Sequence, residues 1–269
     1  MTDYHVHIGQ YGKVYYYADR VFSALKESGV DEVWFSSTTS CIYCKESNAA
    51  QADKAIFDSA PTAYELYEDI RGEVQNALNA AVEIGMKAHA LYWVVPEVHF
   101  AKAVTVKQAM SETAYDGFKI HTFAQKWDLQ DARTMALAEE VFSYAESHGL
   151  FILIHCGDDD FEKPSLFEPL IARHPSVTVQ LAHCRPLKET LEMLKKYPNT
   201  VCDTAFVSDD TRQKIERAGF GGRICYGTDF PITHYLSERP NHDPTADELT
   251  AWFSSTPAQS CTPQSSPSH

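Results

Sequence analysis

Five ionisable side chains stand at or beside the ends of short apolar runs in this sequence of 269 residues. They are His5 and His7 in YHVHI, His155 in FILIHCG, His183 in VQLAHC and Asp229 after ICYGT. His5 and His7 are two residues apart, so in a β-strand both side chains point to the same side. Imidazole and carboxylate groups suit Zn²⁺, and also Mn²⁺, Fe²⁺ or Co²⁺. If the fold brings these segments together, the five groups predict a binding site for a divalent metal ion.

A structural explanation competes with the metal site for each of these residues taken alone. A single histidine in an apolar run is usually a hydrogen-bonded core residue, and the chain has 12 histidines. Five ionisable residues at the ends of four separate runs are much harder to obtain by chance, so the metal interpretation is favoured for the set. Lys119 and His121 lie on one face of the run GFKIH, and for them both interpretations stay open.

Eight apolar runs alternate with helical segments, and this alternation predicts the fold. Each run is rich in Val, Ile, Phe or Tyr or is almost continuously apolar, as buried parallel strands are; the runs are 4–8, 32–36, 88–95, 117–121, 151–156, 177–184, 201–206 and 224–228. Helices are expected at 60–84, 131–147, 187–196 and 209–218. The pattern predicts an α/β protein with a single (β/α)8 TIM barrel, whose strand ends meet at one mouth where such enzymes build their sites. The alternative is an open, doubly wound sheet, although GxGxxG and GxxxxGK[ST] are both absent.

Composition limits the domain organisation and the partners. Residues 254–269 are rich in Ser and Pro and are expected to form a disordered tail, which leaves residues 1–253 for one barrel domain. The net charge of −14 disfavours nucleic acid and anionic membranes as partners. No run approaches the roughly 20 apolar residues of a membrane span. Seven scattered cysteines and an N-terminus without a secretory pattern predict a cytoplasmic protein.

The order of the ionisable residues resembles that of the amidohydrolase superfamily. The resemblance rests on HxH (His5, His7), strand-end His155, strand-end His183 and a late GTDFP with Asp229, and it extends from residue 3 to about residue 250. It is nearest to the amidohydrolase-related group of metal-dependent hydrolases and decarboxylases, which are (β/α)8 barrels. The resemblance implies that His5, His7, His155 and Asp229 hold one divalent metal ion, with Zn²⁺ the first expectation, and that His183 is a general base or orienting group.

The resemblance also implies a second arrangement. In two-metal members His183 would hold the second ion, and a carboxylated Lys119 would bridge the pair. One ion is favoured here, because the KIH arrangement also occurs in relatives with one metal. In either case a bound metal lowers the pKa of water from 15.7 to about 7 and polarises a carbonyl. Asp229 would then move the proton from the water to the leaving group, while His183 would stabilise the oxyanion.

The substrate is expected to be a small molecule, and a carboxylate or phosphate is one candidate feature. Lys119, His121 and Arg185 are the expected substrate-binding residues because they offer positive charge at the barrel mouth. Arg185 has an alternative as a solvated helix-entry residue paired with Glu189. The aromatic clusters 15–17 and 92–93 are expected mainly in the core, with a pocket as the alternative.

The expected reaction is hydrolysis of a C–N or C–O bond, in an amide or a lactone. Metal-dependent non-oxidative decarboxylation is the first alternative, and a TatD-like nuclease is a weaker one, because that family expects a glutamate where this chain has FKIH. A non-catalytic barrel would usually have lost ligands that are all present. A lone CxxC at Cys41 and Cys44 is interpreted as two free thiols in a loop, because no second CxxC occurs. The oligomeric state is not predicted.

Overall fold

The computed structural model describes residues 1–11, 14–39, 62–125 and 127–233. The Cys41–Cys44 motif with its expected loop and the expected tail at 254–269 lie outside these residues. None of the helices in the described ranges is long and apolar enough to cross a membrane.

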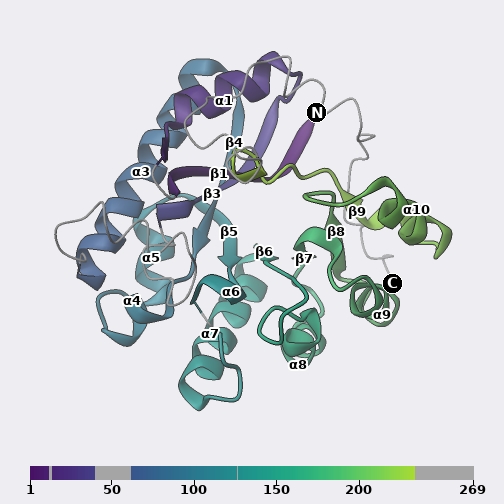
Figure 1. Cartoon of the computed structure of the whole chain (residues 1–269). Coiled ribbons are helices and arrows are strands. Elements are labelled where there is room, and N and C mark those ends of the chain that lie inside the picture. Colours follow the sequence, from purple (N-terminus) through teal and green to yellow (C-terminus); the bar gives the residue numbers. More distant parts are fainter. Residues whose placement is uncertain (12–13, 40–61, 126, 234–269) are drawn as a thin grey trace, which may run out of the picture.

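A curled and largely parallel sheet forms the centre of the described chain, with helices around its outside (Figure 1). The parallel strands are β1 (Thr2–Tyr11), β3 (Glu32–Ser37), β4 (Lys87–Trp93), β5 (Tyr115–Ile120), β6 (Phe151–Ile154), β7 (Val179–Leu181), β8 (Thr200–Asp203) and β9 (Ile224–Cys225). They neighbour one another in chain order, and each of the eight expected runs corresponds to one of them. The strand β2 (Val14–Tyr16) was not expected, and it pairs antiparallel with the end of β1.

Hydrogen bonds connect β1 with the segment that follows β9, at the other edge of the sheet. The amide of Tyr4 donates to the carbonyl of Tyr226 (2.9 Å), and the amide of His7 donates to the carbonyl of Phe230 (2.8 Å). The amide of Asp229 donates back to the carbonyl of His5 (2.7 Å). This contact between the first and last strands is what brings Asp229 beside the HxH motif.

Several of the helices begin and end at recognisable capping residues. They are α1 (Ala18–Glu27), α3 (Ala63–Ile84), α4 (Pro96–Phe100), α5 (Val106–Glu112), α6 (Thr122–Gln125), α7 (Ala132–His148), α8 (Glu168–Arg173), α9 (Leu187–Lys196) and α10 (Asp209–Arg217), with 3₁₀ turns η2 (Pro164–Phe167), η3 (Ala182–Cys184) and η4 (Gly221–Arg223). For α7, the Asp131 side chain accepts from the Thr134 amide (2.8 Å), and Gly149 ends the helix at φ 63°. The expected helix at 187–196 matches α9, and the other three agree within a few residues.

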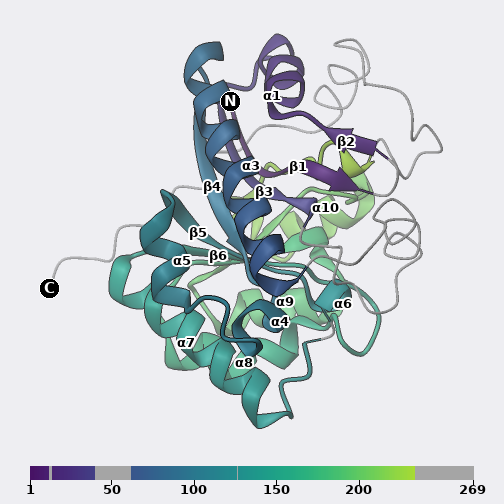
Figure 2. The same ribbon diagram turned by 90° about the vertical axis from the view of Figure 1, so that its left-hand side faces the viewer.

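The apolar side chains divide into a large outer core and a small inner cluster. Between sheet and helices, Phe22 of α1 meets Phe35 of β3 with ring centroids 5.3 Å apart. Inside the curl of the sheet, Leu91, Leu153 and Ala182 form a separate cluster. Leu153 of β6 lies two residues before His155, which directly follows the strand and does not close it as expected, so the alternation of the extended chain points both inward. The inner cluster therefore lies directly next to the polar residues of the site, and helices cover the outer face of the sheet (Figure 2).

Candidate metal centre

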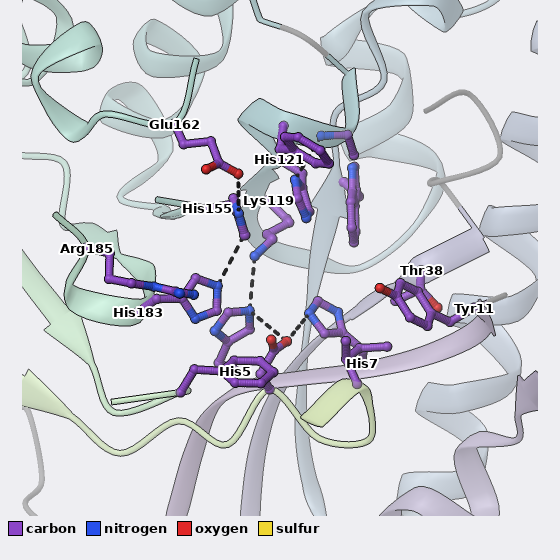
Figure 3. A pocket seen from close by; sticks show the side chains of 16 residues that line it. His5, His7, Tyr11, Thr38, Lys119, His121, His155, Glu162, His183 and Arg185 are labelled. Carbon is purple, nitrogen blue, oxygen red and sulfur yellow. Dashed lines mark hydrogen bonds and ion pairs between the residues drawn. The ribbon is translucent and has the colours of Figure 1, made fainter. Parts of the chain in front are cut away.

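Three of the expected ligands, His5, His7 and Asp229, form one buried group. One ligand atom from each lies within 4.8 Å of the others. The Oδ1 atom of Asp229 is 2.9 Å from His7 Nε2 and 3.5 Å from His5 Nε2 (Figure 3). The histidines lie within β1 and not at its end as expected, because the strand continues to Tyr11 and pairs there with β2. Asp229 lies beyond β9 in a left-handed conformation with φ 55°.

The buried carboxylate of Asp203, at the end of β8, determines which nitrogen of His5 faces this group. Its Oδ2 lies 3.0 Å from His5 Nδ1 and accepts from Gln180 Nε2 at 2.7 Å. Its Oδ1 accepts from the amides of His183 (2.9 Å) and Ala205 (3.1 Å). Burial raises the pKa of Asp203, but these donors favour the ionised carboxylate. Since the carboxylate accepts, His5 Nδ1 carries the proton, and the lone pair of Nε2 faces His7 and Asp229.

Sequence reasoning missed Asp203. It lies inside the expected apolar run 201–206, and only the structure shows that the strand ends at Asp203.

His155 and His183 contact each other, and His183 also lies beside His5, with ring centroids 5.4 Å apart. His155 Nδ1 and His183 Nε2 are 3.1 Å apart. The outer nitrogens are also paired: His183 Nδ1 lies 3.1 Å from the carbonyl oxygen of Ala205, and His155 Nε2 lies 3.1 Å from Glu162 Oε1. His183 was expected to close its strand, but β7 ends at Leu181, and His183 sits in η3 with φ 65°.

This chain of contacts fits a cation between the two rings. A carbonyl oxygen can only accept, and the Glu162 carboxylate oxygen is placed to accept in the same way, so the outer nitrogens of both rings are assigned the protons. The inner nitrogens, His155 Nδ1 and His183 Nε2, then have lone pairs that face each other. Two lone pairs at this separation repel unless they share a proton or a metal ion. Two nitrogens bound to one metal at about 2 Å each lie about 3 Å apart, so the spacing matches a shared metal ion.

Lys119 and His121 have different places in the site. Lys119 on β5 is buried, and its Nζ lies 3.0 Å from His5 Nε2. The His121 ring is stacked between Trp93 and His155, with centroid distances of 5.1 Å and 3.9 Å. The Ala124 amide donates to His121 Nδ1 at 3.1 Å. Lys119 therefore contacts the candidate metal ligands, whereas His121 forms part of a wall.

The residues converge on a cavity of about 370 Å³. Its lining includes all eight expected site residues, together with Glu162, Trp93, Tyr11, Thr38, Phe123, Ala124, Phe206 and Ile232. Arg185 lines the cavity. Glu189, which was the alternative partner for Arg185, accepts a hydrogen bond from Ser165 Oγ (2.6 Å). Of the aromatic clusters, Trp93 reaches the cavity, Tyr92 and Tyr16 are buried, and Tyr15 and Tyr17 are exposed.

Burial determines the charge state of these groups. Desolvation lowers the pKa of His155 to about 3 and that of His183 to about 4, and it lowers the pKa of His5 well below its usual value. Burial acts to raise the pKa of Asp229, but the neighbouring His5 and His7 imidazoles outweigh it and hold the pKa well below its usual range. Near neutral pH the site therefore offers uncharged imidazoles and an ionised carboxylate, which is the form in which these groups bind metal ions.

Comparison with known proteins identifies the family. A family profile described as amidohydrolase matches residues 58–260, and the chain belongs to this family. The match begins after the HxH motif, so the case for His5 and His7 rests on the sequence order and the geometry. The resemblance expected from the ligand order is thus confirmed at the level of the family. Comparison with curated proteins finds no significant match.

Solved structures with a similar fold share little sequence with this chain. A protein from Staphylococcus aureus assigned by name to the amidohydrolases superposes with a TM-score of 0.55 and 11% identity, over 93% of this chain and 95% of the other. A 2,6-dihydroxybenzoate decarboxylase gives 0.51 and 11%, over 91% and 82%. A 5-carboxyvanillate decarboxylase from Sphingomonas paucimobilis gives 0.51 and 14%, over 87% and 80%. At these identities the similarity shows the fold.

Proposed function

We propose that this protein is a metal-dependent hydrolase that cleaves a C–N or C–O bond, in an amide or a lactone, of a small molecule. The observation that carries the proposal is the buried group at the cavity in which the imidazoles of His5 and His7 face the Asp229 carboxylate. The contact between β1 and the segment after β9 supports a complete (β/α)8 barrel as the scaffold.

The proposed metal site holds one ion, with Zn²⁺ as the first candidate. His5 and His7 would bind it through Nε2 and Asp229 through its carboxylate. His155 would complete the set through Nδ1, the nitrogen that faces the site. The close pairing of His155 with His183 also suits a second ion, and a carboxylated Lys119 would then lie between the two positions. Metal content distinguishes these arrangements.

Two side chains of this protein would transfer the protons and orient the attacking water. A bound divalent metal supplies a Lewis acid and a water acidic enough to ionise near neutral pH. Asp229 would accept the proton of the attacking water and return it to the leaving group. His183, which lies on the cavity wall and keeps the lone pair of Nε2, would accept a hydrogen bond from the attacking water as a general base or orienting group.

The cavity lining supports a substrate that combines an apolar part with a negative group. Trp93, Phe123 and Phe206 offer aromatic surface. Arg185 and Lys119 line the same cavity and would bind a carboxylate. His121 would contribute its ring face to the wall more than a charge, because burial holds its pKa well below its usual value.

Non-oxidative decarboxylation is the second candidate. The observation that favours it is the buried Lys119 beside His5, because a cation there would bind a carboxylate next to the metal position. Two of the proteins with a similar fold are named as decarboxylases of aromatic acids, which makes such acids reasonable test substrates.

The test is elemental analysis of the purified protein, followed by chelation, reloading with Zn²⁺ or Mn²⁺, and assays of the loaded protein. Release of acid or amine from amides or lactones supports hydrolysis, whereas release of carbon dioxide from hydroxybenzoates supports decarboxylation. Near one equivalent of metal supports the single site, and near two supports the pair of sites. A protein that binds no metal under any loading contradicts the proposal.

A further inference from the structure

A carboxylate that no expectation included contacts the outer nitrogen of His155. Glu162 follows β6 in the loop 157–163, and its Oε1 lies 3.1 Å from His155 Nε2. Only 12% of the Glu162 side chain and 18% of the His155 side chain are exposed. The carboxylate lies on the side of the ring opposite to His183 (Figure 3). Glu162 thus contacts a candidate metal ligand without belonging to the group of His5, His7 and Asp229.

The loop is folded so that this carboxylate points inward. The Gly157 amide donates to the Glu162 carbonyl (3.1 Å), and the Glu162 amide donates to the Asp159 carbonyl (2.9 Å). The Asp159 amide donates to Glu162 Oε2 at 3.3 Å. A Cβ atom at Gly157 would overlap Oε2 and Cδ of Glu162, so a glycine at this position leaves room for the carboxylate.

Packing alone leaves the orientation of the His155 ring undecided. The ring stacks on His121 with an interplanar angle of 13°, and this contact determines its plane. A half-turn of the ring keeps the same plane but exchanges the edges, and side-chain torsions of this kind are roughly two-fold. A hydrogen-bond partner on one edge is therefore needed to decide which nitrogen faces the site.

We propose that Glu162 is a positioning residue, which accepts the Nε2 proton of His155 and thereby presents the Nδ1 lone pair to the metal site. This inference rests on the proposed function, because it concerns the same site. Asp203 acts on His5 in the same way with the nitrogens exchanged: it holds Nδ1, and Nε2 faces the site. A carboxylate on the outer nitrogen is a common means of orienting a metal-binding histidine.

The experiment compares four variants in two measurements. Glu162→Ala removes the carboxylate, Glu162→Gln keeps an accepting oxygen, and Gly157→Ala pushes the carboxylate aside with little other change. Asp160→Asn is the control in the same loop, since that carboxylate is exposed and pairs with Lys163. Long-range ¹H–¹⁵N NMR of the metal-free protein reports which ring nitrogen of His155 carries the proton. Competition with a chelator measures the affinity for Zn²⁺.

We expect the proton on Nε2 of His155 in the wild type and in Asp160→Asn. Glu162→Ala and Gly157→Ala should lose this preference and bind Zn²⁺ about 10- to 100-fold more weakly. Glu162→Gln should keep most of the Nε2 tautomer preference and most of the affinity for Zn²⁺. General destabilisation by the substitutions would not explain this difference from Glu162→Ala. A proton on Nδ1 alone in the wild type, or an unchanged tautomer and affinity in Glu162→Ala, would overturn the inference. If the wild type binds no metal, the proposed function fails, while the NMR measurement still tests Glu162.

Discussion

His5 Nδ1 lies 3.0 Å from the carboxylate of Asp203, a residue 198 positions away in the chain. This contact gives His5 a defined tautomer, in which Nε2 keeps its lone pair toward His7 and Asp229. The same carboxylate accepts the amide of His183, whose backbone has a positive φ. One buried acid therefore holds a candidate metal ligand and the turn that carries a candidate catalytic residue.

Replacing Asp203 with Asn should weaken metal binding about 10- to 100-fold. An amide nitrogen would replace one carboxylate oxygen, and in the Oδ2 position it would face the donors of His5 and Gln180. Chelator competition measures the affinity, and circular dichroism of the same sample shows whether the fold is kept. Asp210→Asn, at an exposed position in α10, is the control and should bind metal as the wild type does. Equal affinities in the two variants would contradict the positioning role.

Replacing Asp229 with Asn should abolish turnover and leave much of the metal bound. The amide oxygen can still coordinate, but the side chain can no longer take a proton from water. Loss of general acid–base catalysis predicts a decrease in kcat of at least about 100-fold. Steady-state rates and metal content should be measured on one preparation. Near-normal activity in this variant would rule out the proton-transfer role of Asp229.

Metal removal should lower the thermal stability, because the metal binds the folded state. At a free metal concentration about 100 times Kd, binding adds about 2.7 kcal/mol to the free energy of unfolding. Calorimetry with a chelator, and again after adding excess Zn²⁺, should show a fall and a recovery of Tm. A double variant His5→Ala and His7→Ala should show neither change. A wild-type Tm that is unchanged by the chelator and by excess Zn²⁺ would contradict the proposed metal site.

The stability should also depend on pH through His89, far from the candidate ligands in the sequence. Burial acts to lower its pKa, but contacts with Asp116 (3.0 Å) and Glu32 (2.9 Å) outweigh it and raise the pKa. The folded state therefore holds this proton more tightly than the unfolded state does. Its contribution is complete below the unfolded-state pKa of about 6.5 and is lost as the pH rises through the folded-state value.

Urea unfolding at several pH values tests this relationship. From pH 6 upward, the wild type should lose more of its free energy of unfolding than His89→Gln does. The difference between the two proteins isolates the histidine, because their other titrating groups are the same. Parallel pH profiles for the two proteins would contradict the assignment.

The sequence by itself predicted the strands and most of the candidate site residues. Apolar runs buried on both faces are visible without a structure, and each of the eight corresponds to a parallel strand. His5, His7 and Asp229 could be found because strand ends in such a fold converge on one side. The family was recognisable for the same reason, since the order of ligands along the chain follows the order of the strands.

Only the tertiary structure decided how these residues are paired. His155 lies against His183 and Glu162 and apart from the group of His5, His7 and Asp229, and no spacing in the sequence indicates this. Asp203 and Glu162 were missed because an acidic side chain looks the same in the sequence whether it is solvated or hydrogen-bonded to a buried ring. Their roles arise from contacts that exist only after folding, and it is these contacts that determine which nitrogen of each histidine carries a proton.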